Sequence, residues 1–104
     1  MQKTEIISAA AFPMAVRHGT VLVIFSADWC AHCVTQSRIV DNMASRNRFP
    51  DAVRVGIVCV DDAPLVAEKL EIEAIPAQVV FRDGVELHRH IGIADETELL
   101  QLLQ

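Results

Sequence analysis

The chain has 104 residues, of which 52% are hydrophobic, and this is enough for one domain with one packed core. Its formal net charge of −5 argues against a nucleic-acid-binding protein, which normally needs a basic face. No apolar run approaches the roughly 18 residues of a membrane span. From the charge and the missing apolar run, we expect neither nucleic acid nor a membrane among its partners.

The first 25 residues predict a strand, a short helix and a second strand. The first strand is predicted for residues 4–7. Ser8 could cap the short helix, with Pro13 near its start and Gly19 at its end. The β-branched and aromatic run of residues 20–25 is typical of a strand buried on both faces.

The middle of the sequence predicts a long helix, a strand and a shorter helix. The long helix is predicted for residues 31–47, because its apolar positions fall on one side. Residues 53–60 form the next apolar run, and we expect a strand there. Asp62 followed by Pro64 predicts a capped helix that runs to about Leu70.

A hairpin is predicted near the end of the chain. Pro76 comes just before a strand predicted for residues 77–81, at a position where strands tolerate proline. Asp83-Gly84 is a hairpin turn signal, and residues 85–91 are predicted to return as the second strand.

The last helix completes an alternating order of elements. Asp95 with Glu98 forms a capping-box pattern. Its buried side is predicted to consist of Leu99, Leu100, Leu102 and Leu103. The order β-α-β-α-β-α-β-β-α predicts a single α/β domain over residues 1–104, with a sheet that is parallel at first and closed by an antiparallel hairpin.

Three cysteines, Cys30, Cys33 and Cys59, cannot all pair within the chain. One close pair and one isolated cysteine are typical of a reducing compartment and indicate a reactive or metal-binding pair. The first residues carry one Lys and one Glu before a short apolar stretch, which does not resemble a signal peptide. We therefore expect a cytoplasmic protein.

The spacing of Cys30 and Cys33 indicates redox chemistry at a helix start. Sulfurs three residues apart there lie on the same side of the helix and can form a disulfide. Free backbone N–H groups favour a negative charge on the first sulfur, and the thiolate is the nucleophile in disulfide exchange. We predict that Cys30 attacks and that Cys33 resolves the mixed disulfide. Protonated His32 would favour the thiolate and make the disulfide more oxidising.

Several segments together resemble the thioredoxin family over nearly the whole chain. They are Phe25 to Cys33 with its Trp29-Cys30-Ala31-His32-Cys33 motif, Val60-Asp61, Ala74-Ile75-Pro76, Phe81 to Gly84, and Gly92. The resemblance implies a thioredoxin-like three-layer fold with a central mixed sheet flanked by helices. It also implies dithiol/disulfide exchange with protein disulfides, recharged by a reductase or a small-thiol donor. No cofactor or metal is needed, because the dithiol itself carries the electrons, and we expect a monomer.

The same resemblance implies where a substrate binds. It implies a cis bond between Ile75 and Pro76 that faces the cysteine pair. The Ile75 backbone would then pair with an extended substrate strand. The remaining rim of this groove would consist of Trp29, Ala31, Ala74 and Gly92.

Three features depart from the family pattern. Ala31-His32 stands where the most studied reductases carry Gly-Pro, and His before the second cysteine is similar to isomerases and periplasmic disulfide oxidases. Many thioredoxins bury an Asp and a Lys at the places of Ile24 and Ile57, so we predict that Cys33 releases the mixed disulfide more slowly here. Gln78 falls in a predicted strand where apolar residues are usual, and if buried it needs hydrogen-bond partners.

Other interpretations of the cysteine pair remain open. An oxidase or isomerase is one alternative to a reductase. Another is a non-catalytic thioredoxin-like binding or chaperone module with a structural thiol pair. A zinc site lacks a second pair of ligands, and an iron–sulfur cluster has no positive signal. His32 could be an exposed residue with little effect on the thiols.

Four further features have simpler interpretations. Cys59 is expected to be a small buried hydrophobic residue. His88 and His90 share one face of a predicted strand, which is more often solvated than metal-binding. Trp29 could pack in the core, although its place beside the motif favours the rim. The Asp61-Asp62 pair is expected to cap a helix.

Overall fold

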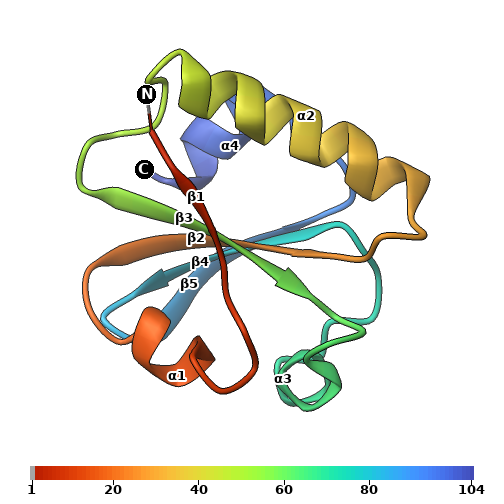
Figure 1. Ribbon diagram of the computed structural model, residues 1–104. Helices are drawn as coiled ribbons and strands as arrows, with labels where there is room; N and C mark the ends of the chain where they lie inside the picture. Colours follow the sequence, from red (N-terminus) through yellow and green to blue (C-terminus); the bar gives the residue numbers. More distant parts are fainter. Residues whose placement is uncertain (1) are drawn as a thin grey trace.

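A five-stranded mixed sheet forms the middle layer of the computed structural model, which describes residues 2–104 (Figure 1). The strands lie in the order β1-β3-β2-β4-β5. Their bounds are β1 Thr4–Ile6, β2 Thr20–Ser26, β3 Val53–Cys59, β4 Ala77–Arg82 and β5 Val85–Ile91. The first three strands are parallel, whereas β4 is antiparallel to both β2 and β5. The predicted α/β fold with a mixed sheet is therefore confirmed.

Helices cover both faces of this sheet (Figure 1). Their bounds are α1 Phe12–Ala15, α2 Ala31–Ser45, α3 Pro64–Lys69 and α4 Glu96–Leu102. α2 and α4 cover one face, and α1 and α3 cover the other (Figure 1). The five consecutive residues from Val21 to Phe25 in β2 are all buried, because this central strand packs on both sides.

Each face of the sheet has its own apolar cluster. The cluster beneath α1 and α3 includes Phe12, Val16, Val23, Phe25, Val79 and Phe81. The cluster beneath α2 and α4 includes Leu22, Ile24, Val40, Met43, Val80 and Leu99. Val21, Val23 and Phe25 of β2 belong to the first cluster, and Leu22 and Ile24 belong to the second, as the period of two in a strand requires.

Two predicted helix caps were wrong. α1 begins at Phe12 with Ala11 as its N-cap, and Ser8 instead accepts the backbone N–H of Ala11 in the preceding turn at 3.1 Å. α3 begins at Pro64 with Ala63 as its N-cap, so Asp62 lies one position too early to cap it. In both cases proline in the first turn sets the helix start without a side-chain cap.

The predicted hairpin and the last helix cap are confirmed. Asp83 and Gly84 have positive φ angles of 51° and 85°, as a tight hairpin turn between β4 and β5 requires. Asp95 accepts the N–H of Glu98 at 2.8 Å, and the Glu98 side chain accepts the N–H of Asp95 at 3.1 Å. These reciprocal bonds satisfy two backbone donors at the start of α4.

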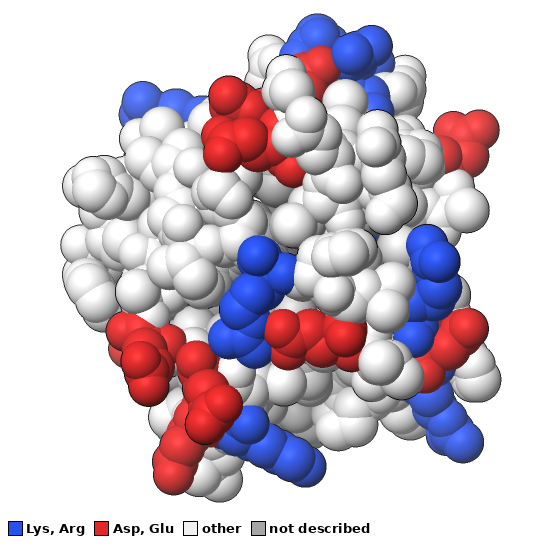
Figure 2. All heavy atoms as spheres, turned by 180° about the vertical axis from the view of Figure 1, so that it is seen from behind, with Lys and Arg blue, Asp and Glu red and all other residues white. Residues whose placement is uncertain are grey.

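Charged side chains of both signs are interspersed on the face seen in Figure 2, with uncharged surface between them. The ion pairs among the described residues include Arg46–Glu96, Arg48–Glu96 and Arg89–Glu86. Within residues 2–104, no helix combines the length and the apolar character needed to cross a membrane.

Candidate active site

Cys30 is the N-cap residue of α2. Its backbone is extended, with φ −97° and ψ 113°, because the chain leaves β2 and turns into the helix at this point. The Cys30 sulfur accepts the backbone N–H of Cys33 at 3.2 Å, and the side chain is partly exposed. A hydrogen bond to the sulfur from a free helix N–H stabilises the thiolate form.

Cys33 has a different environment one turn further along. Its side chain is only 2% exposed, and it is a free thiol like Cys30. Burial, together with the hydrogen bond to the Cys30 sulfur, raises the pKa of Cys33 to about 11. Hydrogen bonds from the Ala27 backbone and the Ser26 side chain oppose this rise without cancelling it. The thiol at position 33 is therefore protonated at neutral pH.

A second wall faces the cysteines across a short gap. The Ile75–Pro76 bond is cis, as the family resemblance implied, and Pro76 is buried at the start of β4. The carbonyl oxygen of Ile75 lies 3.9 Å from the Cys30 sulfur. The backbone N–H of Gly92 donates to the Pro76 carbonyl at 2.8 Å, which attaches the end of β5 to this wall.

The other predicted rim side chains, those of Trp29, Ala31 and Ala74, are exposed. The Trp29 side chain is 71% exposed, so it does not pack in the core. Its indole N–H donates to the Asp61 carboxylate at 2.8 Å. This bond corrects the expectation that Asp61 caps a helix, because its carboxylate holds the indole instead. Ala31, His32 and Ala74 are also exposed.

Ile24 and Ile57 form an apolar pair across β2 and β3. The two residues are direct neighbours in the parallel register, and Ile24 is 2% exposed. Ile24 lies two positions before Ser26 on the same strand, and therefore on the same face as the hydroxyl that reaches Cys33. No carboxylate stands at this place to accept a proton from the buried thiol.

Sequence reasoning missed one buried polar residue near the cysteines. Gln36 lies three residues after Cys33 on α2 and is fully buried, as is Gln78 on β4. The Gln36 amide accepts the N–H of Ala94 at 2.7 Å and donates to the Ala94 carbonyl at 3.0 Å. The available signal was the placement of Gln36 one turn after Cys33 on the inward side of the helix.

The other candidate ligands do not gather in one place. Within residues 2–104, no three His, Cys, Asp or Glu side chains lie close enough together to hold a metal ion. His88 is exposed, and His90 contacts the Ile93 carbonyl at 3.2 Å. Cys59 is partly exposed at the end of β3, opposite Ser26, rather than buried as expected.

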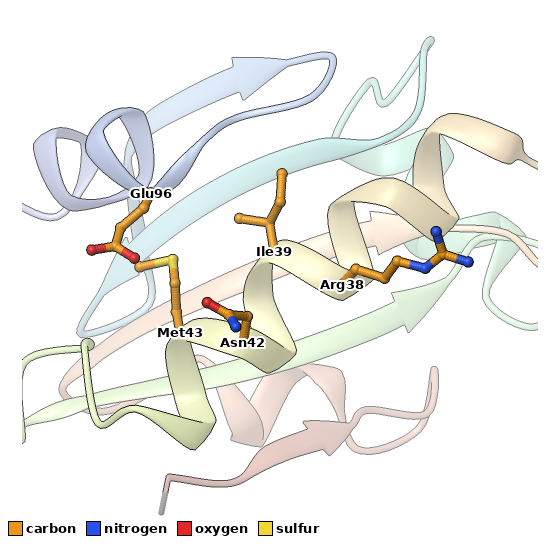
Figure 3. Close-up of a pocket in the computed structure, with 5 residues that line it drawn as sticks. All are labelled: Arg38, Ile39, Asn42, Met43 and Glu96. Carbon is orange, nitrogen blue, oxygen red and sulfur yellow. The ribbon is translucent and has the colours of Figure 1, made fainter.

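A hollow of about 320 Å³ lies between α2 and α4, on the half of α2 away from Cys30 (Figure 3). It is lined by Arg38, Ile39, Asn42, Met43 and Glu96. Met43 points toward Glu96 of α4, whereas Arg38 points away along the helix (Figure 3). The hollow contains neither cysteine and is separate from the gap beside Ile75.

Comparisons with known proteins agree with this geometry. The sequence model of the thioredoxin family matches residues 3–104. The chain is 34% identical to a thioredoxin of Chlamydia pneumoniae over 99 residues, which covers 95% of this chain and 94% of that one. A thioredoxin of Chlamydia caviae is 30% identical with the same coverage.

Solved structures show the same fold. A thioredoxin mutant from Halobacterium salinarum superimposes with a TM-score of 0.83 at 24% identity, over 96% of this chain and 87% of that one. A thioredoxin of Malassezia sympodialis gives a TM-score of 0.85 at 22% identity, over 100% of this chain and 94% of that one. Together with the Cys30–Cys33 pair, these findings show that the chain belongs to the thioredoxin family and is a thiol–disulfide oxidoreductase.

Proposed function

We propose that the chain exchanges its dithiol with disulfides of protein substrates, with Cys30 as the attacking sulfur and Cys33 as the resolving one. The observation that carries this proposal is the unequal placement of the two sulfurs. The Cys30 sulfur is partly exposed, accepts a helix N–H at 3.2 Å and lies 3.9 Å from the Ile75 carbonyl. Cys33 is buried directly behind it.

The exchange has two steps that balance in atoms and electrons. The Cys30 thiolate attacks one sulfur of the substrate disulfide, a new S–S bond forms, and the other substrate sulfur leaves as a thiolate that takes up a proton. Cys33 then loses its proton and attacks the Cys30 sulfur, which expels the second substrate thiol. The substrate is reduced by two electrons, and the Cys30–Cys33 pair becomes the disulfide.

The wall opposite the cysteines supports an extended substrate. The Ile75 backbone is at the edge of the gap, next to buried Pro76, where an incoming strand can form main-chain hydrogen bonds. We assign Trp29, Ala31, Ala74 and Gly92 to the rim of this groove. The bond from Trp29 to Asp61 supports this role, because it holds a large apolar ring at the surface beside Cys30.

The direction of exchange is proposed as reduction of protein disulfides in the cytoplasm, recharged by a reductase or a small thiol. The single close cysteine pair supports a reducing compartment. Exposed His32 in the first turn of α2 favours the second candidate, an oxidase or isomerase, because a positive charge there stabilises the dithiol form.

Insulin reduction with dithiothreitol tests catalysis. The native chain is expected to accelerate precipitation of the insulin B chain, and Cys30→Ser is expected to abolish this acceleration. Cys33→Ser is expected to accumulate a mixed disulfide with the substrate, while Cys59→Ser serves as the matched control with native activity. If the Cys30→Ser/Cys33→Ser double variant kept full activity, the redox proposal would be wrong.

A redox titration with glutathione tests the direction. A reductase is expected to have a reduction potential of about −270 mV, whereas oxidases and isomerases have potentials of about −120 to −180 mV. A value in the second range would replace the reductase proposal with the oxidase or isomerase and would leave the roles of Cys30 and Cys33 in place.

A further inference from the structure

Two glutamines lie in the interior between the cysteine helix and the end of the sheet. Within the described residues, Gln36 and Gln78 are the two buried polar side chains, and both are 0% exposed. Gln36 is on α2, three residues after Cys33. Gln78 is on β4, two residues after Pro76. Each glutamine is therefore close in sequence to one wall of the groove, and neither takes part in the chemistry described above.

Gln36 binds the connection between β5 and α4. Its amide oxygen accepts the Ala94 N–H at 2.7 Å, and its amide nitrogen donates to the Ala94 carbonyl at 3.0 Å. Ala94 itself is 0% exposed. β5 ends at Ile91 and α4 begins at Glu96, and residues 92–95 connect them, with Gly92 bonded to Pro76 and Asp95 bonded to the first turn of α4. The two Gln36 bonds hold Ala94, between these two ends, from inside the core.

Gln78 lies between Gln36 and the same connection. Its amide group is within hydrogen-bond distance of three oxygens: the side-chain oxygen of Gln36 at 2.9 Å, the His90 carbonyl at 2.8 Å and the Gly92 carbonyl at 3.0 Å. In either orientation of the amide, its NH₂ group donates to Gln36 or to the end of β5. These amides are shielded from water, so losing one of their bonds leaves a buried polar group without a partner.

The connection held in this way carries exposed apolar side chains. Ile91 is 49% exposed and Ile93 is 36% exposed. Gly92, between them, donates to the Pro76 carbonyl at 2.8 Å. The segment 91–93 therefore adjoins the wall formed by Ile75 and Pro76. In Figure 1, the blue connection from β5 to α4 passes behind α2, on the side of the sheet that α2 covers.

We propose that Gln36 and Gln78 are positioning residues that fix segment 91–93 as a binding wall for polypeptide substrates. They favour an extended chain over a small disulfide, because only the longer substrate reaches both Cys30 and the Ile91–Ile93 surface. This inference rests on the proposed exchange with protein disulfides. It concerns how strongly such substrates bind and leaves the reacting sulfurs unchanged.

Steady-state kinetics with two disulfides of different size test the inference. Insulin is the polypeptide substrate, bis(2-hydroxyethyl) disulfide is the small one, and dithiothreitol supplies the electrons to both. In Gln36→Leu, KM for insulin is expected to rise about three- to tenfold, the size of one or two net hydrogen bonds, while kcat changes less than about twofold. The rate with the small disulfide and the alkylation rate of Cys30 are expected to stay native.

Val40→Ala is the matched control. Val40 is fully buried one turn further along α2, so its truncation weakens the same helix without removing a bond to Ala94. Hydrogen exchange of the Ala94 amide distinguishes the loss of the local Gln36 bonds from a general loss of stability. In Gln36→Leu, the Ala94 amide is expected to exchange at least about tenfold faster than in the native protein. In Val40→Ala, its exchange is expected to rise only as far as the loss of global stability explains. If Gln36→Leu does not fold, Gln78→Leu retains the Gln36–Ala94 bonds and is expected to raise KM for insulin about threefold.

The outcomes separate this inference from the proposed function. A native KM for insulin in folded Gln36→Leu or Gln78→Leu would overturn the inference, as would an equal loss with the small disulfide or an equal rise of KM in Val40→Ala. If the native chain reduced neither disulfide, the proposed function itself would be wrong. A selective rise in KM for insulin together with faster Ala94 exchange would confirm the positioning role.

Discussion

The sulfur atoms of Cys30 and Cys33 lie one helical turn apart in different surroundings. Cys30 is at the open N-terminus of α2, where its sulfur accepts a backbone N–H. Cys33 is 2% exposed, and burial raises its pKa to about 11. Cys33 must therefore lose a proton in an apolar setting before it can attack, whereas the Cys30 sulfur is the accessible one.

The raised pKa of Cys33 predicts a loss of stability in alkaline solution. In the reduced unfolded chain this thiol has its ordinary pKa near 9, and in the folded chain about 11. Between these values the native state binds more protons than the unfolded state, so the free energy of unfolding falls as the pH rises from 9 to 11. The loss is on the order of 2 kcal/mol. Urea unfolding of the reduced protein at a series of pH values measures it.

The control for this effect is Cys33→Ala. This variant lacks the titrating thiol, so its stability is expected to have a smaller slope between pH 9 and 11 than the native protein. Equal slopes in the two proteins would contradict the assignment of the pH dependence to Cys33.

The apolar pair at Ile24 and Ile57 predicts slow release of the mixed disulfide. Ile24→Asp places a carboxylate on the strand face that carries Ser26, whose side chain contacts Cys33. Such a base is expected to speed the resolving step about tenfold or more. A lone buried carboxylate is also expected to cost about 3–5 kcal/mol of stability, part of which Ile57→Lys should restore. Stopped-flow measurement of mixed-disulfide decay tests the rate.

Ile24→Asn serves as the comparison, because it is polar and similar in size but is not a base. The carboxylate explanation requires Asp to be faster than Asn at this position. A resolving step that is unchanged or slower in Ile24→Asp would rule it out.

At the residue scale, spacing located the two cysteines and Pro76 but not Gln36. Two cysteines three residues apart after a buried strand form a local pattern that a sequence displays directly. The partner of Gln36 is the backbone of Ala94, 58 residues away, and a backbone partner leaves no signal in the side chains. The bond from Trp29 to Asp61 was missed for a similar reason, since it depends on how two loops meet.

Among the elements, β1 and β3 approach each other closely where Gly56 packs against Ile7. A Cβ atom added at Gly56 would collide with the end of the Ile7 side chain, which is 6% exposed. Gly56→Ala is therefore expected to destabilise the protein by about 1–3 kcal/mol through overpacking. Thermal unfolding measures this change.

A double variant separates this collision from the strand propensity of residue 56. Ile7→Val shortens the colliding side chain, so Gly56→Ala should cost less in the Ile7→Val background than in the native one. Equal costs in the two backgrounds would show that the collision is not the cause.

Element boundaries were predictable where side chains set them and less so where the backbone did. The Asp83-Gly84 turn fixed residues 85–91 of β5, and the Asp95–Glu98 capping box fixed the start of α4. Ser8 and Asp62 were wrong as caps, because each helix begins further along the chain than these residues would allow. Proline in the first turn is compatible with that later start. Capping residues are common in loops, so their presence near a proline does not identify the cap.

For the whole molecule, the reduction potential shifts with the difference in stability between the dithiol and disulfide forms. His32→Pro removes the imidazole beside Cys30 and is expected to lower the potential by about 30 mV, which corresponds to about 1.4 kcal/mol. The disulfide form should then gain that much stability relative to the dithiol form. A glutathione titration and unfolding of both forms give two independent values, and no shift in either would show that His32 has little effect on the thiols.

The sheet separates the molecule into two packed halves, and the proposed groove has one wall from each. The helix that carries the cysteines belongs to the cluster that contains Val40 and Met43, while Ile75 packs against the cluster on the opposite face. Substitutions in one half can therefore alter one side of the groove while the sheet keeps the other in place. Apart from the Gln36–Ala94 contact, the helix that carries the reactive sulfurs and the Ile75 wall belong to separate cores and can therefore vary separately.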